Sequence, residues 1–210
     1  MSRVSKPLTR VLLAAPAAAL AACLGVTAAL AATTWTVKPG GSFTAKSGTA
    51  TFKDTATGSV FTCTSVSMTG TLKRGTGLSG SGVGSISAVG FTNCTSPLNL
   101  RFFLKATALP WHVNLAADNK GAVTGTISHI QIQVTNPGCA FVLDGTGAAA
   151  RDGSLKFRYT DSTGRLTLLR TGGNLNVYNV RGCAALVNDN DPLALSATFT
   201  LNPKQAITSP

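Results

Sequence analysis

The chain has 210 residues, enough for one domain or two small ones, and a formal net charge of +11. Glutamate is absent while Thr, Ser, Gly and Val are abundant, which favours strands and turns over helices. The basic residues are spread along the chain instead of forming a stripe, so the composition argues against nucleic acid as a partner.

The N-terminal segment, residues 1–31, has the parts of a secretory signal peptide. Basic residues precede an apolar stretch over 11–30, which ends in the small-x-small sequence Ala29-Leu30-Ala31. We therefore predict a secreted protein that begins at Ala32. Two alternatives stay open. Leu20-Ala21-Ala22-Cys23 is similar to a lipobox, which would attach a lipid to Cys23 and place the protein at a membrane, and the uncleaved stretch is long enough to anchor the chain.

Alternating apolar and polar residues, bounded by Gly, Pro, Asn and Asp, predict short strands throughout the rest of the chain. No segment has the pattern of an amphipathic helix. The fold class that we predict is all-β, an antiparallel sandwich or barrel without substantial helix. The tail from residue 202 is expected to be loose. The expected strands are 42–46, 49–53, 60–63, 65–72, 86–94, 98–104, 109–115, 123–134, 139–143, 155–159, 165–169, 175–183 and 193–201.

Three parts of the chain have patterns that allow more specific expectations. Residues 73–82 are rich in glycine and read as an exposed loop, but they lack the Lys and the following helix of a phosphate-binding loop. In the expected strand 98–104 the alternation of apolar and polar residues fails at Phe103. This predicts either that the strand is buried on both faces at that end or that it contains a bulge. In 123–134 the apolar residues change parity, so we expect that strand to bend or bulge midway.

An internal repeat organises the chain. Residues 86–94 and 175–183 both have apolar residues at the first, third and sixth places and a cysteine at the ninth. Upstream of each segment lie a cysteine and a G-[TS]-L-K sequence, and Pro-Leu follows each. This order predicts two related β halves, residues 32–115 and 116–210, which could be fused into one domain.

The cysteines support export and a particular pairing. Four remain after residue 31, an even number, as expected for a chain that is oxidised outside the cytoplasm. Three pairings are possible. If the halves are equivalent, Cys63 pairs with Cys94 and Cys139 with Cys183, so that each half is stapled by its own disulfide.

Catalytic and metal-binding patterns are weak. His112 and His129 are candidates for a hydrolase, but no G-x-S-x-G sequence is present, and two separated histidines without free cysteine do not make a zinc site. The aspartates sit in turns, which explains them without catalysis. Asp189 and Asp191 are weak calcium candidates because they lack the spacing of an EF-hand. No cofactor is predicted.

Leu109-Pro110-Trp111 carries the candidate binding residues, Trp111 and His112. A Trp that follows Pro either caps the core or is exposed and grips sugars or apolar ligands. The tripeptide, the paired cysteines and the Thr- and Gly-rich strands resemble a group of uncharacterised secreted all-β proteins of high-GC Gram-positive bacteria. The tripeptide between two cysteine pairs is also similar to a secreted family named for activating alkane oxidation. That likeness implies a role at the cell surface or with apolar substrates, and no catalytic residues carry over from it.

The sequence thus predicts an exported protein that is not an enzyme and has a binding or structural role at the cell surface or beyond. Its expected partners are cell-wall polymers, to which a basic protein is attracted, or apolar small molecules. The alternatives are a carrier of small apolar ligands or an inhibitor, and a hydrolase that uses His112 or His129. A membrane is a partner only if Cys23 is lipidated.

Overall fold

The computed structural model describes residues 33–210, and the predicted signal peptide and Cys23 lie outside this range. The described residues form strands and no helix, which confirms the all-β prediction, and they include no helix able to cross a bilayer. The sixteen strands are β1 (Thr34–Lys38), β2 (Gly41–Ser47), β3 (Ala50–Asp54), β4 (Val60–Leu72), β5 (Gly75–Ser79), β6 (Gly84–Thr95), β7 (Arg101–Thr107), β8 (Trp111–Asp118), β9 (Ala122–Asn136), β10 (Cys139–Asp144), β11 (Gly153–Thr160), β12 (Arg165–Leu168), β13 (Asn176–Arg181), β14 (Leu193–Ser196), β15 (Thr198–Asn202) and β16 (Ala206–Thr208).

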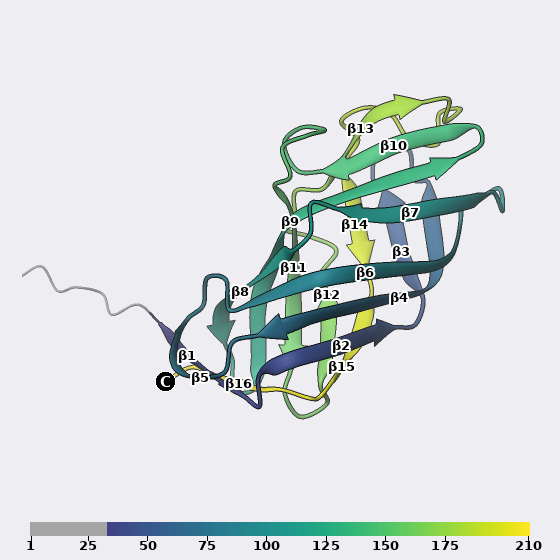
Figure 1. Ribbon diagram of the computed structural model, residues 1–210. Helices are drawn as coiled ribbons and strands as arrows, with labels where there is room; N and C mark the ends of the chain where they lie inside the picture. The colour runs from purple at the N-terminus through teal and green to yellow at the C-terminus, as the bar shows by residue number, and fades with distance from the viewer. Residues whose placement is uncertain (1–32) are drawn as a thin grey trace, which may run out of the picture. The chain divides into compact units, whose positions relative to one another are not determined.

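Eight of the strands close into an antiparallel barrel (Figure 1). Around the ring the order is β4-β2-β15-β12-β11-β9-β8-β6, and β6 pairs again with β4. Apolar residues at every second position point inward, as in β11, where Leu155, Phe157 and Tyr159 are buried. Of the two architectures expected, the barrel is the one observed.

The two longest strands, β4 and β9, extend beyond the barrel and hold a second group of strands. The first part of β4 pairs with β3, which pairs with β14. The last part of β9 pairs with β7 and β10, and β10 pairs with β13. The apolar core of the barrel continues into this region, where the rings of Phe61, Phe102 and Phe141 lie within 5.1–6.5 Å of one another, measured between centroids.

A small sheet in the order β16-β1-β5 covers one end of the barrel (Figure 1). Two expectations are wrong here. Part of the glycine-rich segment forms β5, and the tail is not loose, because β16 pairs with β1 and Ile207 is buried. Both β5 and β16 are ordered by backbone hydrogen bonds to β1. The pattern of side chains in the sequence does not reveal such hydrogen-bond partners.

Both predicted disulfides are present. Cys63 on β4 faces Cys94 on β6, 31 residues later, and Cys139 on β10 is bonded to Cys183, just beyond β13 and 44 residues later. The first bond joins two paired strands, and the second joins β10 to the residues that directly follow its paired strand β13.

The strands before and after residue 115 pair with one another in several places. β2 pairs with β15, β3 with β14 and β8 with β9, and the described residues 33–210 belong to one compact unit. The expected boundary falls inside β8. The internal duplication itself stays a prediction.

Candidate functional site

Trp111 lies in the wall of the barrel with its indole inside. It is 4% exposed, and its Nε1 donates a hydrogen bond to the Thr107 carbonyl oxygen at 3.1 Å. The ring borders an apolar cavity of about 30 Å³, and a second cavity of the same size lies toward Phe157. Each has about the volume that one water molecule occupies in the liquid. The barrel interior is therefore filled by side chains.

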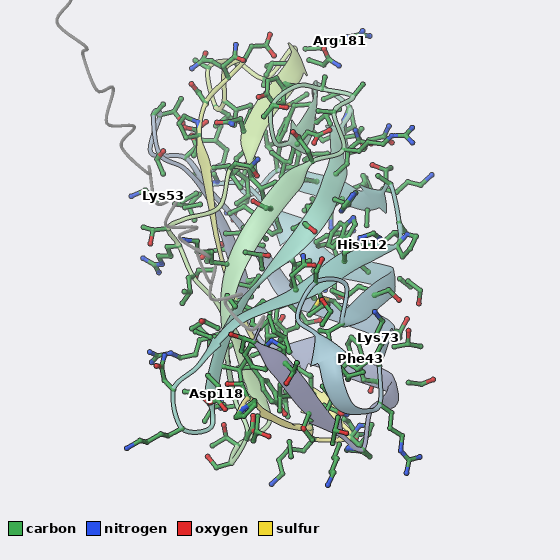
Figure 2. All side chains as sticks on the ribbon, turned by 90° about the vertical axis from the view of Figure 1, so that its left-hand side faces the viewer. Phe43, Lys53, Lys73, His112, Asp118 and Arg181 are labelled. Atoms are coloured by element: carbon green, nitrogen blue, oxygen red, sulfur yellow. A yellow bond between two sulfur atoms is a disulfide. The ribbon has the colours of Figure 1, made fainter. Side chains whose placement is uncertain are left out.

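His112, the next residue, points outward because neighbouring side chains of a strand take opposite faces. It lines a surface groove of about 300 Å³ together with Lys73 and Ser85 (Figure 2). Its imidazole lies against that of His129, with 4.3 Å between the ring centroids. Sequence reasoning treated these histidines as separate, and the structure brings them together on the outside of the barrel. We call His112 and His129 the histidine pair.

For the described part of the chain, the hydrogen bond found for the histidine pair joins His129 Nδ1 to Ser128 Oγ at 3.3 Å. The aspartate carboxylates are hydrogen-bonded to other parts of the chain. Each of the seven accepts a hydrogen bond from at least one backbone N–H, as their positions in turns predict.

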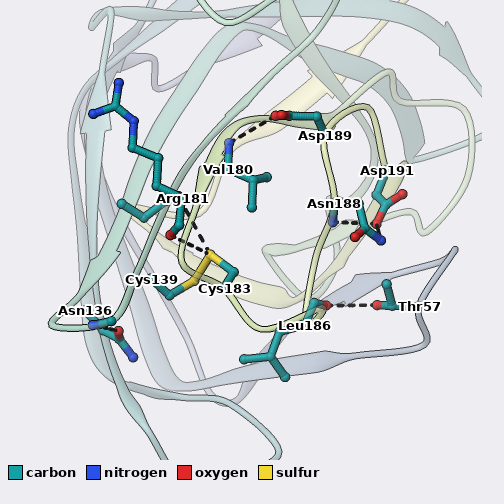
Figure 3. Close-up of a disulfide and its surroundings, with 12 residues drawn as sticks. Thr57, Asn136, Cys139, Val180, Arg181, Cys183, Leu186, Asn188, Asp189 and Asp191 are labelled. Atoms are coloured by element: carbon teal, nitrogen blue, oxygen red, sulfur yellow. Dashed lines mark hydrogen bonds between the residues drawn. A yellow bond between two sulfur atoms is a disulfide. The ribbon is translucent and has the colours of Figure 1, made fainter.

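Asp189 and Asp191, the calcium candidates, hold the loop that follows Cys183 (Figure 3). Asp189 Oδ1 accepts a hydrogen bond from the Val180 N–H at 3.0 Å, and Asp191 Oδ2 accepts one from the Asn188 N–H at 2.7 Å. Residues 33–210 contain no cluster of three or more His, Cys, Asp or Glu side chains around a possible metal position.

Asp54 lies behind this loop and is fully buried. Its Oδ1 accepts hydrogen bonds from the Ala56 and Thr57 N–H groups, both at 2.8 Å, while its Oδ2 has no donor. Burial raises the pKa of this carboxyl group, and the neighbouring carboxyl group of Asp191 raises it further. Protonation of Asp54 would remove its charge from the buried site and the repulsion between the two carboxyl groups.

An exposed group of apolar side chains lies at the start of β7. Leu98 is 66% exposed, Leu100 44% and Phe103 67%, and we call these three residues the apolar patch. They make up three of the five large apolar side chains that are exposed in the described residues. The expectation that Phe103 is buried is wrong, because β7 turns Phe102 into the core and Phe103 out to solvent, and its pairing with β9 has no register shift.

A groove of about 200 Å³ runs beside the apolar patch, between β6 and β7. The two strands pair only where Cys94 and Thr95 face Phe102 and Arg101, and they then separate because β7 joins β9 while β6 joins β8. Phe91, Phe102 and Phe103 line the groove. The Arg101 guanidinium borders it and donates a hydrogen bond to Asn93 Oδ1 at 3.5 Å.

Basic side chains surround these features without clustering, as Lys53, Lys73 and Arg181 show on separate parts of the surface (Figure 2).

The signal for the apolar patch was present in the sequence as the failed alternation of apolar and polar residues at Phe103. An outward Phe and a buried one give the same pattern, so the sequence did not distinguish them.

Comparison with known proteins gives one match. The family model described as "Alkane oxidation protein activator PraA/PraB-like" matches residues 8–203, which is nearly the whole chain. No curated protein and no solved structure matches it.

Proposed function

This chain belongs to the PraA/PraB-like family of alkane oxidation protein activators, and we propose that it works outside the cytoplasm by binding apolar surfaces through the apolar patch. In this proposal the protein performs no catalysis. It attaches to the surface of an apolar substrate such as an alkane phase, and the enzymes that oxidise the substrate are other proteins.

The observation that carries the proposal is the exposure of Leu98, Leu100 and Phe103 within six consecutive residues. Exposed apolar groups of this kind mark interaction sites in soluble proteins. Covering each of these side chains is worth about 1 to 3 kcal/mol, given the apolar area that each leaves in water. Three together supply enough free energy for reversible attachment.

The filled barrel favours surface attachment over transport inside the protein. Ligand sites in proteins have volumes of roughly 300–1,000 Å³, whereas the apolar cavities in the barrel have about 30 Å³ each. Two disulfides are consistent with a location outside the cytoplasm, where the substrate phase is found.

The test is partitioning into a hexadecane emulsion. We expect the purified tag-free chain from residue 32 to accumulate on the droplets, and the triple variant Leu98→Ser/Leu100→Ser/Phe103→Ser to stay in the aqueous phase. Leu169→Ser is the matched control because Leu169 is also exposed, at 36%, but lies directly after β12. A parallel assay with insoluble cell wall measures attraction to polymers.

Two results would overturn the proposal. One is equal accumulation of the wild type and the triple variant on hexadecane. The other is binding of the wild type to cell wall with none to hexadecane.

A further inference from the structure

Along β9 the regular alternation of inward and outward side chains is interrupted at His129. Ile127 and Ile130 both point inward, although a regular strand places residues three apart on opposite faces. The extra residue is a β-bulge, since the pairing with β11 shifts between Ser154, opposite Ser128, and Gly153, opposite Ile130. This bulge confirms the predicted irregularity in 123–134.

The bulge is conformationally costly for the residue that occupies it. His129 has a φ of +64°, a left-handed conformation that only a few per cent of non-glycine residues adopt, with His among the more tolerant types. A regular strand would carry His129 inward. The bulge instead turns its imidazole outward, next to Ser128, and bulges are often found where a strand must redirect a side chain toward a site.

The redirected imidazole meets His112 on the neighbouring strand. His112 is paired with Ser128, the residue before the bulge, and the two rings lie 4.3 Å apart with an interplanar angle of 41°. Two imidazoles that share a metal ion at roughly 2.0–2.1 Å per nitrogen have centroids about 4.5–5 Å apart. The centroid separation of the pair lies within about 1 Å of that range.

The groups around His112 and His129 are compatible with two imidazole nitrogens that bind a metal ion. His129 Nδ1 and Ser128 Oγ share a hydrogen bond at 3.3 Å. In the tautomer that carries its hydrogen on Nδ1, the Nε2 lone pair is free, which is the usual arrangement of a metal-binding histidine. Ser128 Oγ in turn accepts a hydrogen bond from Asn114 Nδ2 at 3.1 Å. Among the described residues, the groove that His112 lines contains no carboxylate, which disfavours hard cations, and the Lys73 charge at its border lowers the affinity for any cation.

We propose that the histidine pair binds a divalent transition-metal ion of the class that prefers imidazole, with Cu(II) bound more tightly than Zn(II). The order follows from the general affinities of these ions for nitrogen ligands. The chain supplies two ligands and water fills the remaining positions. This site is independent of the apolar patch, which lies at the start of β7, and either proposal could fail without the other.

The test is titration of the tag-free chain from residue 32 with Cu(II) and with Zn(II), followed by calorimetry and by the change in Tm. Because the chain has two histidines in all, both in the pair, no other imidazole competes. We expect one Cu(II) per chain, a higher Tm with metal, and nitrogen superhyperfine coupling in the Cu(II) electron paramagnetic resonance spectrum.

His112→Asn and His129→Asn are each expected to weaken Cu(II) binding by about tenfold or more, since even the loss of a second-shell partner has an effect of that size. Asn tolerates a positive φ, and His129→Gly keeps the bulge if the Asn variant folds poorly. The proposal is overturned if the double variant binds Cu(II) as the wild type does, or if neither binds it.

Discussion

Gly125 on β9 lies directly opposite Phe157 on β11, and the Phe157 ring covers the place that a side chain at position 125 would occupy. A Cβ atom there would be 2.6 Å from the ring Cζ atom and 2.1 Å from the Asn114 carbonyl oxygen. Gly70 and Phe43 form the same cross-strand pair between β4 and β2. In each pair the ring fills the space above the glycine, so the two residues pack as one unit of the core.

Gly125→Ala should therefore destabilise the protein by about 1–3 kcal/mol, because the added methyl group cannot fit without moving the ring or the backbone of β8. Gly48→Ala is the control. Its Cβ would meet nothing within 4 Å, so this variant should have unchanged or slightly raised stability. Urea denaturation measures both, and equal midpoints for the two variants would contradict the packing described for Gly125.

Removing either disulfide should lower the free energy of unfolding by about 2–4 kcal/mol. The loops of 31 and 44 residues differ too little in closure entropy to separate the two bonds by more than about 0.5 kcal/mol. The variants Cys63→Ala/Cys94→Ala and Cys139→Ala/Cys183→Ala are each compared in urea with the oxidised wild type, and fully reduced wild type shows the effect of losing both bonds. A loss below about 0.5 kcal/mol for both would show that the bonds do not stabilise the fold.

Tyr159→Phe should release the C-terminal strand. The buried phenol donates a hydrogen bond to the Gln205 carbonyl oxygen and accepts one from the Gln205 N–H, both at 2.8 Å. Losing both leaves buried backbone groups unpaired, at about 1–3 kcal/mol. Hydrogen exchange at Ile207 should accelerate more than exchange in β9. Tyr178→Phe is the control, since its half-buried phenol makes a single hydrogen bond, to Gly145.

Asp54→Asn should raise stability at pH 7 and have a smaller effect near pH 4. Because the pKa of Asp54 is raised in the folded state, its favourable contribution is complete below the unfolded value of 3.8 and is lost as the pH rises through the folded value. Asn keeps the acceptor for the Ala56 and Thr57 N–H groups and can donate to Asp191.

Asp152→Asn is expected to act in the opposite direction. Hydrogen bonds from the Thr146 hydroxyl and N–H lower the pKa of Asp152, so its contribution is present above pH 3.8 and is lost as the pH falls through the folded value. Tm values of both variants between pH 3 and 7 test the two signs together. Parallel pH profiles for the two variants would refute the assignment.

Local patterns in the sequence were sufficient for most of the strands and for the disulfides, but not for β5 and β16. Alternation identified β11 from Leu155, Phe157 and Tyr159, and the two cysteine-terminated segments selected the pairing of Cys63 with Cys94. Closure of the barrel was not predictable in this way. It depends on β2 meeting β15, more than a hundred residues later, and the sequence of one strand does not specify its distant neighbour.

The candidate site was less accessible from the sequence for similar reasons. The proximity of His112 and His129 depends on the register of β8 against β9 and on a bulge whose position the sequence indicated only to within a few residues. At Phe103 the two adjacent phenylalanines predicted either burial on both faces or a bulge, and neither is present in β7. The outer face of β7 is exposed to solvent, and no local feature of the sequence predicts whether another element covers that face.

Attachment through the apolar patch is tested most directly by Phe103→Trp. The native Trp35 and Trp111 are 2% and 4% exposed, so they report on the interior while the introduced indole reports on the patch. On addition of hexadecane droplets we expect the fluorescence of Phe103→Trp to shift to shorter wavelength, with no shift for the wild type or for Leu169→Trp. An unchanged spectrum for Phe103→Trp, or a shift in the wild type that signals entry of alkane into the barrel, would contradict the account.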